Sequence, residues 1–160
     1  MMRWVDLPPV WLGLALLLVW VLDRLMPIEL FWLVGRWCGV VLVTGGLAIM
    51  AAAVVQMLAA RTTVIPRSRP ARLVTQGIFR VSRNPIYLGD AMILTGAVLY
   101  WDVPLAIPVV MGFKVLIERR FILQEEVVLR AAFGAAFETW AARVGRWFGA
   151  GNNAAVGMKN

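Results

Sequence analysis

Four apolar runs separated by short polar segments dominate the pattern of this chain. A helix needs about 20 mostly apolar residues to cross the hydrocarbon core of a bilayer. The second run is uncharged over 24 residues and is the clearest span. The pattern predicts an all-α integral membrane protein with about four transmembrane helices, followed by C-terminal helices in the cytoplasm. The four runs are Leu7–Leu22, Trp37–Ala60, about Pro85–Trp101, and Val103–Ile117.

The first run is short for a span, with 16 uncharged residues, and we expect Arg24 and the Met1–Arg3 end to extend it by snorkelling. A cleaved signal peptide is the alternative interpretation, because Arg3 precedes a leucine-rich core. However, the following residues Met26-Pro27-Ile28-Glu29 lack the small residues of a cleavage site. We therefore expect an uncleaved helix.

Small residues in the second run predict a surface where another helix can approach closely. They are Gly39, Gly45, Gly46, Ala48, Ala51, Ala52 and Ala53. Only Trp101-Asp102-Val103-Pro104 separates the third and fourth runs. This predicts a tight antiparallel helical hairpin with Trp101 at the far membrane interface.

Composition agrees with a membrane protein. The chain has 160 residues, is 61% hydrophobic, and has a mean hydropathy of +0.78, whereas a soluble domain is about 45–50% apolar. No polar block is large enough to fold separately, so we expect one domain over residues 1–160. Within it, residues 1–60 hold the N-terminal transmembrane helices, 61–148 the functional core, and 149–160 a frayed tail.

Charge gives the expected orientation. The chain carries 16 Lys and Arg against 9 Asp and Glu. With the N-terminus inside and four spans, 14 basic residues face the cytoplasm and only Arg24 and Arg36 lie outside. We therefore expect both termini in the cytoplasm, in an inner membrane of bacterial type, and no nucleic-acid partner. A belt contacting lipid headgroups explains Arg61, Arg67, Arg69 and Arg72.

Two further features limit the chemistry. Histidine is absent and Cys38 is the only cysteine, so we expect no intrachain disulfide and no metal site. Asp90 lies in the third run, where a carboxylate facing lipid is costly. Lys114 is expected at a similar depth in the fourth run, and we predict an ion pair between Asp90 and Lys114.

Most of the directional polar groups lie in two segments. The first is residues 73–89, where Arg80 and Arg83 flank a turn that leads into a helix beginning near Pro85. Free N–H groups and the dipole at a helix N-terminus favour an anion. A lipid-facing role for these two arginines stays open.

The second segment is a helix that continues beyond the fourth run. With a regular 100° per residue, Glu118, Ile122, Glu125 and Glu126 fall within about 100° of arc. A solvated charged face is one explanation of this arc. A basic wall opposite an acidic wall would instead suit a ligand with both an amino and a carboxylate group.

The residues in these two segments resemble a known superfamily. The strings are Gly77-Ile78-Phe79-Arg80, Ser82-Arg83-Asn84-Pro85-Ile86-Tyr87-Leu88-Gly89, Glu118-Arg119-Arg120-Phe121, Glu125-Glu126-Val127-Val128-Leu129 and Phe133-Gly134-Ala135-Ala136-Phe137, with Trp140 following. Together they resemble the isoprenylcysteine carboxyl methyltransferase and phospholipid N-methyltransferase superfamily of membrane enzymes. The resemblance covers about half the chain, from residue 73 to 147.

The resemblance implies S-adenosylmethionine-dependent methyl transfer to a membrane-embedded lipid or a prenylated substrate at the cytoplasmic face. Transferred by position, the cofactor-binding residues are Gly77, Arg83, Asn84, Pro85, Tyr87, Gly89, Glu125 and Glu126. The two glutamates would hold the amino group of the cofactor, and Glu118 is a weaker candidate. Arg143 or Arg146 would orient a phosphate or carboxylate of the acceptor, or simply be solvated at a helix end. No catalytic base is assigned.

The chain departs from the superfamily pattern in two ways. Asn84 stands where histidine is frequent, which removes a proton acceptor but keeps hydrogen bonding. Phe137 and Trp140 replace paired tyrosines. Together with Tyr87 they either contact the sulfonium by cation–π interaction or pack as ordinary core.

Two alternatives of other classes remain. A pyridine-nucleotide membrane reductase related to the sterol reductases would use the Arg80–Arg83 turn for phosphate. A non-catalytic membrane adaptor would keep the pocket only as scaffold. The sequence leaves open the methyl acceptor, the number of methyl groups moved and the oligomeric state.

Overall fold

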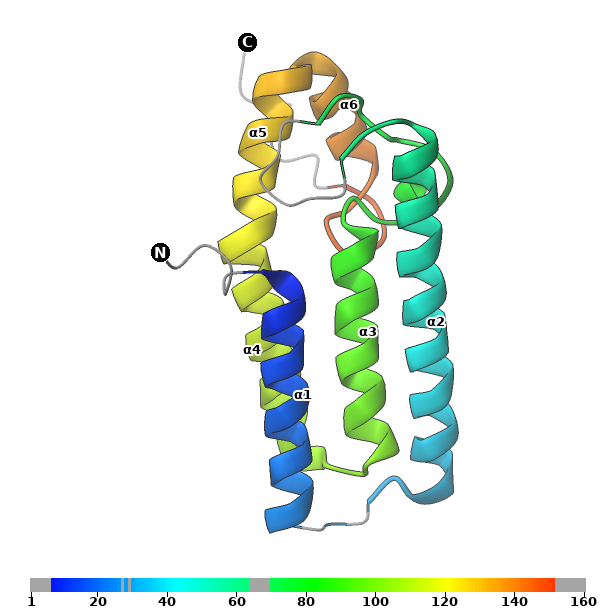
Figure 1. The fold of residues 1–160 in the computed structure, drawn as a ribbon, viewed down its shortest axis with the longest axis vertical. Coiled ribbons are helices and arrows are strands. Elements are labelled where there is room, and N and C mark those ends of the chain that lie inside the picture. Colours follow the sequence, from blue (N-terminus) through cyan, green and yellow to red (C-terminus); the bar gives the residue numbers. More distant parts are fainter. Residues whose placement is uncertain (1–6, 27, 29, 64–69, 152–160) are drawn as a thin grey trace. The chain divides into compact units, whose positions relative to one another are not determined.

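The computed structural model describes residues 7–26, 28, 30–63 and 70–151, and every regular element among them is helical (Figure 1). The α-helices are α1 (Pro8–Leu25), α2 (Trp32–Ala59), α3 (Pro85–Tyr100), α4 (Ile107–Ile117), α5 (Leu123–Phe133) and α6 (Ala135–Arg143). Gly77–Arg80 and Pro104–Ala106 are 3₁₀ turns, and Glu118–Ile122 is a π-helical turn between α4 and α5. The predicted roles of Met1–Arg3, Arg67, Arg69 and tail residues 152–160 lie outside the described residues.

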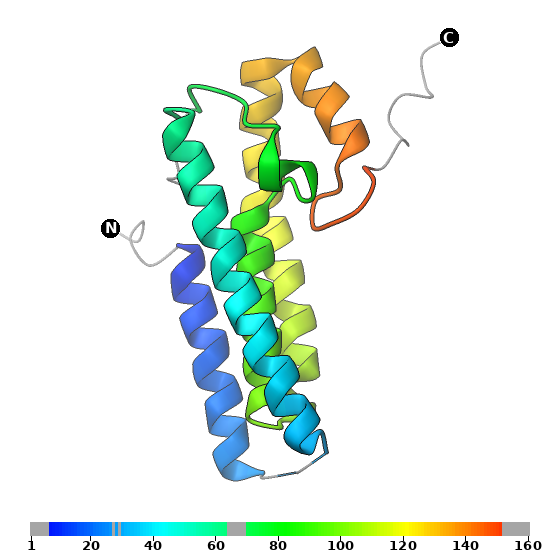
Figure 2. The same cartoon turned by 90° about the vertical axis from the view of Figure 1, so that its right-hand side faces the viewer.

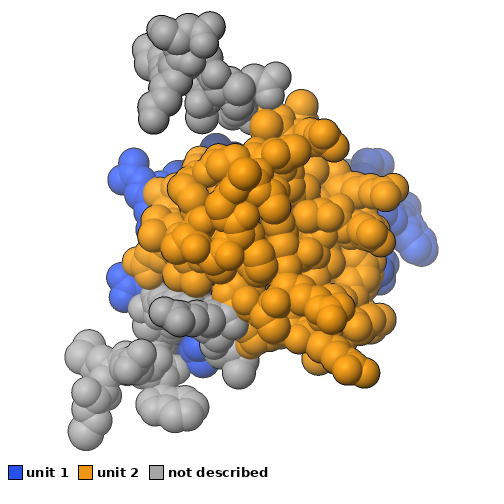
Figure 3. Space-filling model, turned by 90° about the horizontal axis from the view of Figure 1, so that it is seen from above, with its two compact units in different colours: residues 1–48, 89–120 blue, residues 49–88, 121–160 orange. Residues whose placement is uncertain are grey.

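The chain divides into two compact units, coloured separately in Figure 3. Unit 1 comprises residues 1–48 and 89–120, and unit 2 comprises residues 49–88 and 121–160. Helices α2 and α3 each contribute residues to both units. In unit 1, α1 packs against α4, and in unit 2, α6 turns back beside α5 (Figure 2).

Two of the described helices, rather than four, are long and apolar enough to cross a membrane. These are α1, with 18 residues, and α2, with 28 residues. The prediction of about four spans is wrong by this measure, because α3 has 16 residues and α4 has 11. At about 1.5 Å of rise per residue, α3 is roughly 24 Å long, short of the ~30 Å hydrocarbon core.

The surfaces of α1 and α2 remain largely uncovered by the rest of the chain. Within the 18-residue apolar stretch of each helix, only 17% is buried. Large side chains such as Leu17, Trp37 and Leu58 are more than half exposed. An apolar surface of this extent is typical of a helix that faces lipid or a partner, so these helices indicate membrane association.

Close packing of α2 against α3 in unit 1 uses glycine. A Cβ on Gly39 would lie 2.6 Å from the carbonyl oxygen of Gly96, and a Cβ on Gly46 would lie 2.8 Å from that of Gly89. Neither separation can accommodate a real Cβ, so the two backbones approach as closely as they do because these side chains are missing. The predicted small-residue surface is confirmed at Gly39 and Gly46.

We expect Gly39→Ala to lower the free energy of unfolding by about 1–3 kcal/mol, because the added methyl overpacks the α2–α3 contact. Gly112→Ala is the matched control, since a Cβ on Gly112 meets nothing within 4 Å. This control should be neutral or slightly stabilising, because alanine favours helix. Thermal unfolding of the detergent-purified protein measures both, and equal midpoints for the two variants would contradict the packing argument.

A single carboxylate satisfies the backbone at the start of α2. The side chain of Asp102 accepts hydrogen bonds from the backbone N–H groups of Leu30 (3.0 Å), Phe31 (2.8 Å) and Trp32 (2.9 Å). The first N–H groups of a helix lack partners within it, and a negative charge there also interacts favourably with the helix dipole. Asp102 therefore lets α2 begin at Trp32, five residues before the predicted Trp37.

The pKa of Asp102 reflects this role. Desolvation raises it, but the hydrogen bonds from Phe31, Leu30 and Trp32 and the charge of Arg36 together outweigh that effect, so the pKa is lowered from its ordinary value. A carboxylate with a lowered folded-state pKa stabilises the fold at pH values above its unfolded pKa, about 3.9. That contribution is lost as the pH falls through the folded-state pKa.

We therefore expect Asp102→Asn to destabilise the protein by about 0.3–1 kcal/mol near neutral pH, because it removes the negative charge at the start of α2. The difference from the wild type should shrink as the solution is acidified below pH 4. Asp23→Asn is the control, because Asp23 contacts only the adjacent Arg24 at 4.0 Å among the ion pairs found in the described chain. Denaturation curves between pH 3 and pH 7 test this expectation. A difference in unfolding free energy that does not change with pH would contradict it.

The predicted ion pair between Asp90 and Lys114 is absent. Asp90 is only 2% exposed and, among the described residues, forms no hydrogen bond or ion pair. Lys114 is exposed on α4. The helical rise suggested a common depth for the two side chains, but it could not show that one is buried and the other exposed.

Candidate functional site

The candidate site lies in unit 2 and centres on one buried carboxylate. Glu126 of α5 accepts two bonds from the Arg146 guanidinium, Nε to Oε1 at 2.8 Å and Nη2 to Oε2 at 2.9 Å. Arg83 Nη1 lies 3.1 Å from the same Oε1. The side chains of Arg83 and Glu126 are 10% and 7% exposed, so water screens this pair little. We refer to Arg83, Glu126 and Arg146 as the Glu126 cluster.

The turn before α3 places Arg83. Ser82 is fully buried, and its Oγ accepts a hydrogen bond from the Asn84 N–H at 3.0 Å. This local bond is typical of a serine that shapes a turn. Pro85 then begins α3, as its fixed φ favours. The predicted turn into a helix at Pro85 is confirmed.

A segment after α6 is bonded to this turn. Residues 144–149, named here the strap, supply the Gly145 carbonyl, which accepts from the Arg83 N–H at 3.0 Å. The Arg146 carbonyl accepts from Asn84 Nδ2 at 3.0 Å and from Ser82 Oγ at 3.2 Å. The Asn84 amide thus bonds protein backbone where the superfamily frequently has histidine.

A second contact joins α3 to α5 within unit 2. The Tyr87 hydroxyl donates a hydrogen bond to Glu125 Oε1 at 2.6 Å. The Tyr87 ring is buried and lies 6.3 Å from the Phe121 ring, centroid to centroid. The two glutamates are therefore held separately, Glu125 by a tyrosine and Glu126 by two arginines.

The Glu126 cluster holds two guanidinium groups and one carboxylate. Burial lowers the pKa of Arg83, Glu126 raises it, and the nearby Arg146 lowers it further. The guanidinium still stays charged, because arginine does not deprotonate in proteins. Arg83 Nε is fully enclosed and has no hydrogen-bond partner among the described residues. A buried donor without a partner is unfavourable, so this N–H is an unsatisfied polar group inside the cluster.

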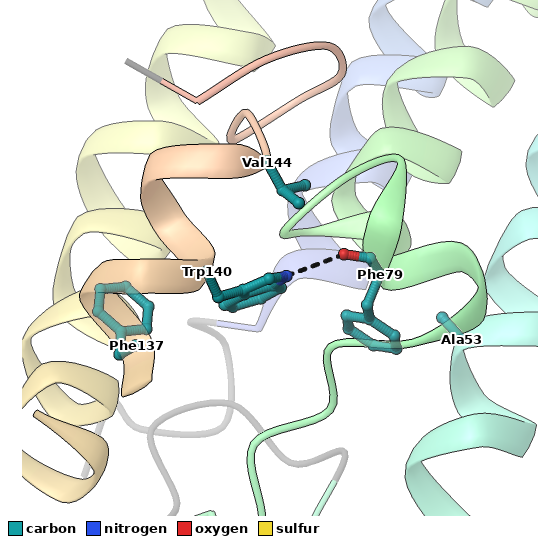
Figure 4. Close-up of a cluster of buried hydrophobic side chains, with 5 residues drawn as sticks. All are labelled: Ala53, Phe79, Phe137, Trp140 and Val144. Atoms are coloured by element: carbon teal, nitrogen blue, oxygen red, sulfur yellow. Dashed lines mark hydrogen bonds between the residues drawn. The ribbon is translucent and has the colours of Figure 1, made fainter. Parts of the chain in front are cut away.

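The aromatic residues of α6 belong to the hydrophobic core of unit 2 (Figure 4). Phe137 is fully buried and Trp140 is 8% exposed, and both belong to a cluster of buried side chains that includes Phe79 and Val144. Trp140 Nε1 donates to the Phe79 carbonyl at 3.1 Å. Of the two predicted roles for Phe137 and Trp140, the structure places them in core packing.

Three other predicted site residues, Gly77, Gly89 and Arg143, are not part of the Glu126 cluster. Gly77 has φ +57° and lies against the Gln56 side chain, whose Oε1 accepts from the Ile78 N–H at 3.2 Å. A side chain at Gly77 would be strained by both the backbone angle and this contact. Gly89 is buried at the α2–α3 contact of unit 1. Arg143 is exposed in the last turn of α6.

The predicted arc of Glu118, Ile122, Glu125 and Glu126 is corrected by the π-helical turn. Glu118–Ile122 adopts i→i+5 bonding, so the 100° spacing does not apply across it. Ile122 is fully buried and Glu126 nearly so, whereas Glu125 is half-buried. Glu118 belongs to unit 1.

Two structural roles were not predicted from the sequence. Ser82 and the carbonyl of Arg146 form the link between turn and strap, and the Arg146 guanidinium pairs with Glu126. A serine two residues before Asn84 is a recognisable turn signal. No local pattern could have paired Arg146 with a carboxylate 20 residues earlier.

The sequence matches the phospholipid methyltransferase family (PEMT) over residues 34–136. This match covers more than half of the chain, so the protein belongs to that family and shares the general methyltransferase character that the family implies. No curated protein and no solved structure matches the chain. The family match over residues 34–136 confirms the resemblance to the wider superfamily. The match includes Arg83, Tyr87, Glu125 and Glu126, but ends before the strap.

We expect Glu126→Gln to destabilise the protein by about 3–5 kcal/mol, because it leaves the buried Arg83 guanidinium without its carboxylate. Glu138→Gln is the matched control. Glu138 also pairs with an arginine, Arg130, but both side chains are about half exposed, and such pairs contribute about 0–1 kcal/mol. Chemical denaturation measures the loss of stability in each variant. Similar losses in the two variants would contradict a structural role for Glu126.

Proposed function

We propose that this protein is an S-adenosylmethionine-dependent methyltransferase that modifies a membrane-embedded lipid or lipidated acceptor at the cytoplasmic face. The family match supports methyl transfer over the reductase and adaptor alternatives. The observation that carries the proposal is the pairing, within unit 2, of the Arg83–Tyr87 segment with the two glutamates of α5.

The residues present fit the amino-acid end of such a cofactor. Arg83 offers a buried cation with an N–H that has no partner among the described residues, which suits a carboxylate. Glu125 offers an anion for an ammonium group, and its position is fixed by the Tyr87 hydroxyl. A cation and an anion from the same unit match the two charges of a zwitterion.

The two glutamates take different roles in this proposal. Glu126 already accepts bonds on both oxygens from Arg146, and Arg83 contacts one of them. Binding a ligand ammonium there would disrupt a buried cluster. Glu125 is half-buried and is the better contact for the cofactor, whereas Glu126 holds the arginines in place.

A bound sulfonium cofactor supplies an electrophilic methyl group for in-line displacement by the acceptor. The chain contributes binding and alignment, which can account for much of the acceleration in such a reaction. Tyr87 and Arg83 are largely buried, so water is restricted around the groups that orient the cofactor. We assign no catalytic base.

Calorimetry with S-adenosylhomocysteine tests the proposal. The wild type should bind it, and Glu125→Gln should bind about tenfold more weakly because a charge-assisted contact is lost. Tyr87→Phe should show a smaller loss. Glu138→Gln, which changes an exposed ion pair of the same unit, should bind as the wild type does.

The other possible outcomes identify the alternatives. A response to NADPH in place of S-adenosylhomocysteine would support the reductase, and no response to either would support the adaptor. Transfer of labelled methyl groups to fractionated membrane lipids would then identify the acceptor class.

A further inference from the structure

The strap lies beyond the residues that match the family, yet it is bonded to the centre of the candidate site. Its Gly145 and Arg146 carbonyls accept three hydrogen bonds from residues 82–84. The Gly145 N–H donates to the Gly149 carbonyl at 2.7 Å, which closes the strap into a tight loop. These bonds fix the backbone from which the Arg146 side chain extends.

The Arg146 guanidinium meets Glu126 with a fork of two nitrogens on two oxygens. This is the strongest geometry available to an arginine and a carboxylate. Arg83 contacts the same carboxylate through one nitrogen only, and its Nε has no partner among the described residues. Arg146 is thus the principal counter-ion of Glu126, and the positive charge of Arg83 is only partly compensated.

We infer that Arg146 is a positioning residue that neutralises Glu126 and so leaves Arg83 available for the carboxylate of the cofactor. The inference rests on the proposed function. Without Arg146, Glu126 would pair fully with Arg83, and the cluster would lose its excess positive charge. A ligand carboxylate would then meet a neutral ion pair in place of a cation.

This role differs from contact with the methyl acceptor. The Arg146 side chain is 37% exposed and directed onto Glu126, whereas Arg143, the other predicted acceptor contact, is exposed at the end of α6. The two arginines lie three residues apart and carry the same charge. Arg143 therefore provides a matched control for the overall charge of this region.

The experiment compares Arg146→Met with Arg143→Met in the full-length protein. Titration calorimetry measures the dissociation constants of S-adenosylhomocysteine and of its decarboxylated analogue, which keeps the amine but lacks the carboxylate. We expect Arg146→Met to weaken binding of S-adenosylhomocysteine at least tenfold and to leave the analogue within twofold. Arg143→Met should leave both unchanged. Arg146→Lys should recover part of the affinity, since it keeps the charge but not the fork.

Equal weakening of both ligands by Arg146→Met would show a purely structural role and overturn the inference. Tighter binding of S-adenosylhomocysteine would show that Arg146 blocks the site, which also overturns it. If Arg146→Met does not fold, the ratio of the two constants in Arg146→Lys decides, and an unchanged ratio counts against the inference. A wild type that binds no S-adenosylhomocysteine refutes the proposed function and this inference with it, whereas wild-type affinity in Arg146→Met refutes the inference alone.

Discussion

Unit 2 depends on the buried carboxylate of Glu126. A charge inside a protein is tolerated only when it is paired and hydrogen-bonded, and Glu126 meets this condition with arginines from two distant parts of the chain. One arginine precedes α3 and the other follows α6. The carboxylate therefore determines where the turn before α3 and the strap after α6 lie relative to α5.

Unit 1 is organised by different forces. In this unit, α2 and α3 approach closely at Gly39 and Gly96, which have no side chains. At the start of α2, Asp102 accepts hydrogen bonds from backbone N–H groups. Neither contact needs water to be expelled from large apolar side chains, which suits helices whose outer surfaces remain apolar and uncovered. The chain thus places close backbone packing in one unit and its charged cluster in the other.

The family match and the cluster complement each other. The match extends from residue 34 to 136 and indicates methyl transfer, but it does not show how charged groups are arranged. The structure gives Glu125 and Glu126 different partners, although they are adjacent in sequence and chemically identical. Adjacent helix residues point about 100° apart, so one glutamate meets Tyr87 and the other meets the arginines.

The sequence by itself determined the helical class, the apolar helices α1 and α2, the helix beginning at Pro85 and the residues that resemble the family, because these follow from local composition and order. Only the tertiary structure decided which side chains meet. Asp90 does not pair with Lys114, Trp140 lies in the core, and Arg146 pairs with Glu126. The π-helical turn at Glu118–Ile122 also escaped prediction, since it changes the helical phase without a local signal. Side-chain direction across long sequence separations depends on packing, and local periodicity does not encode it.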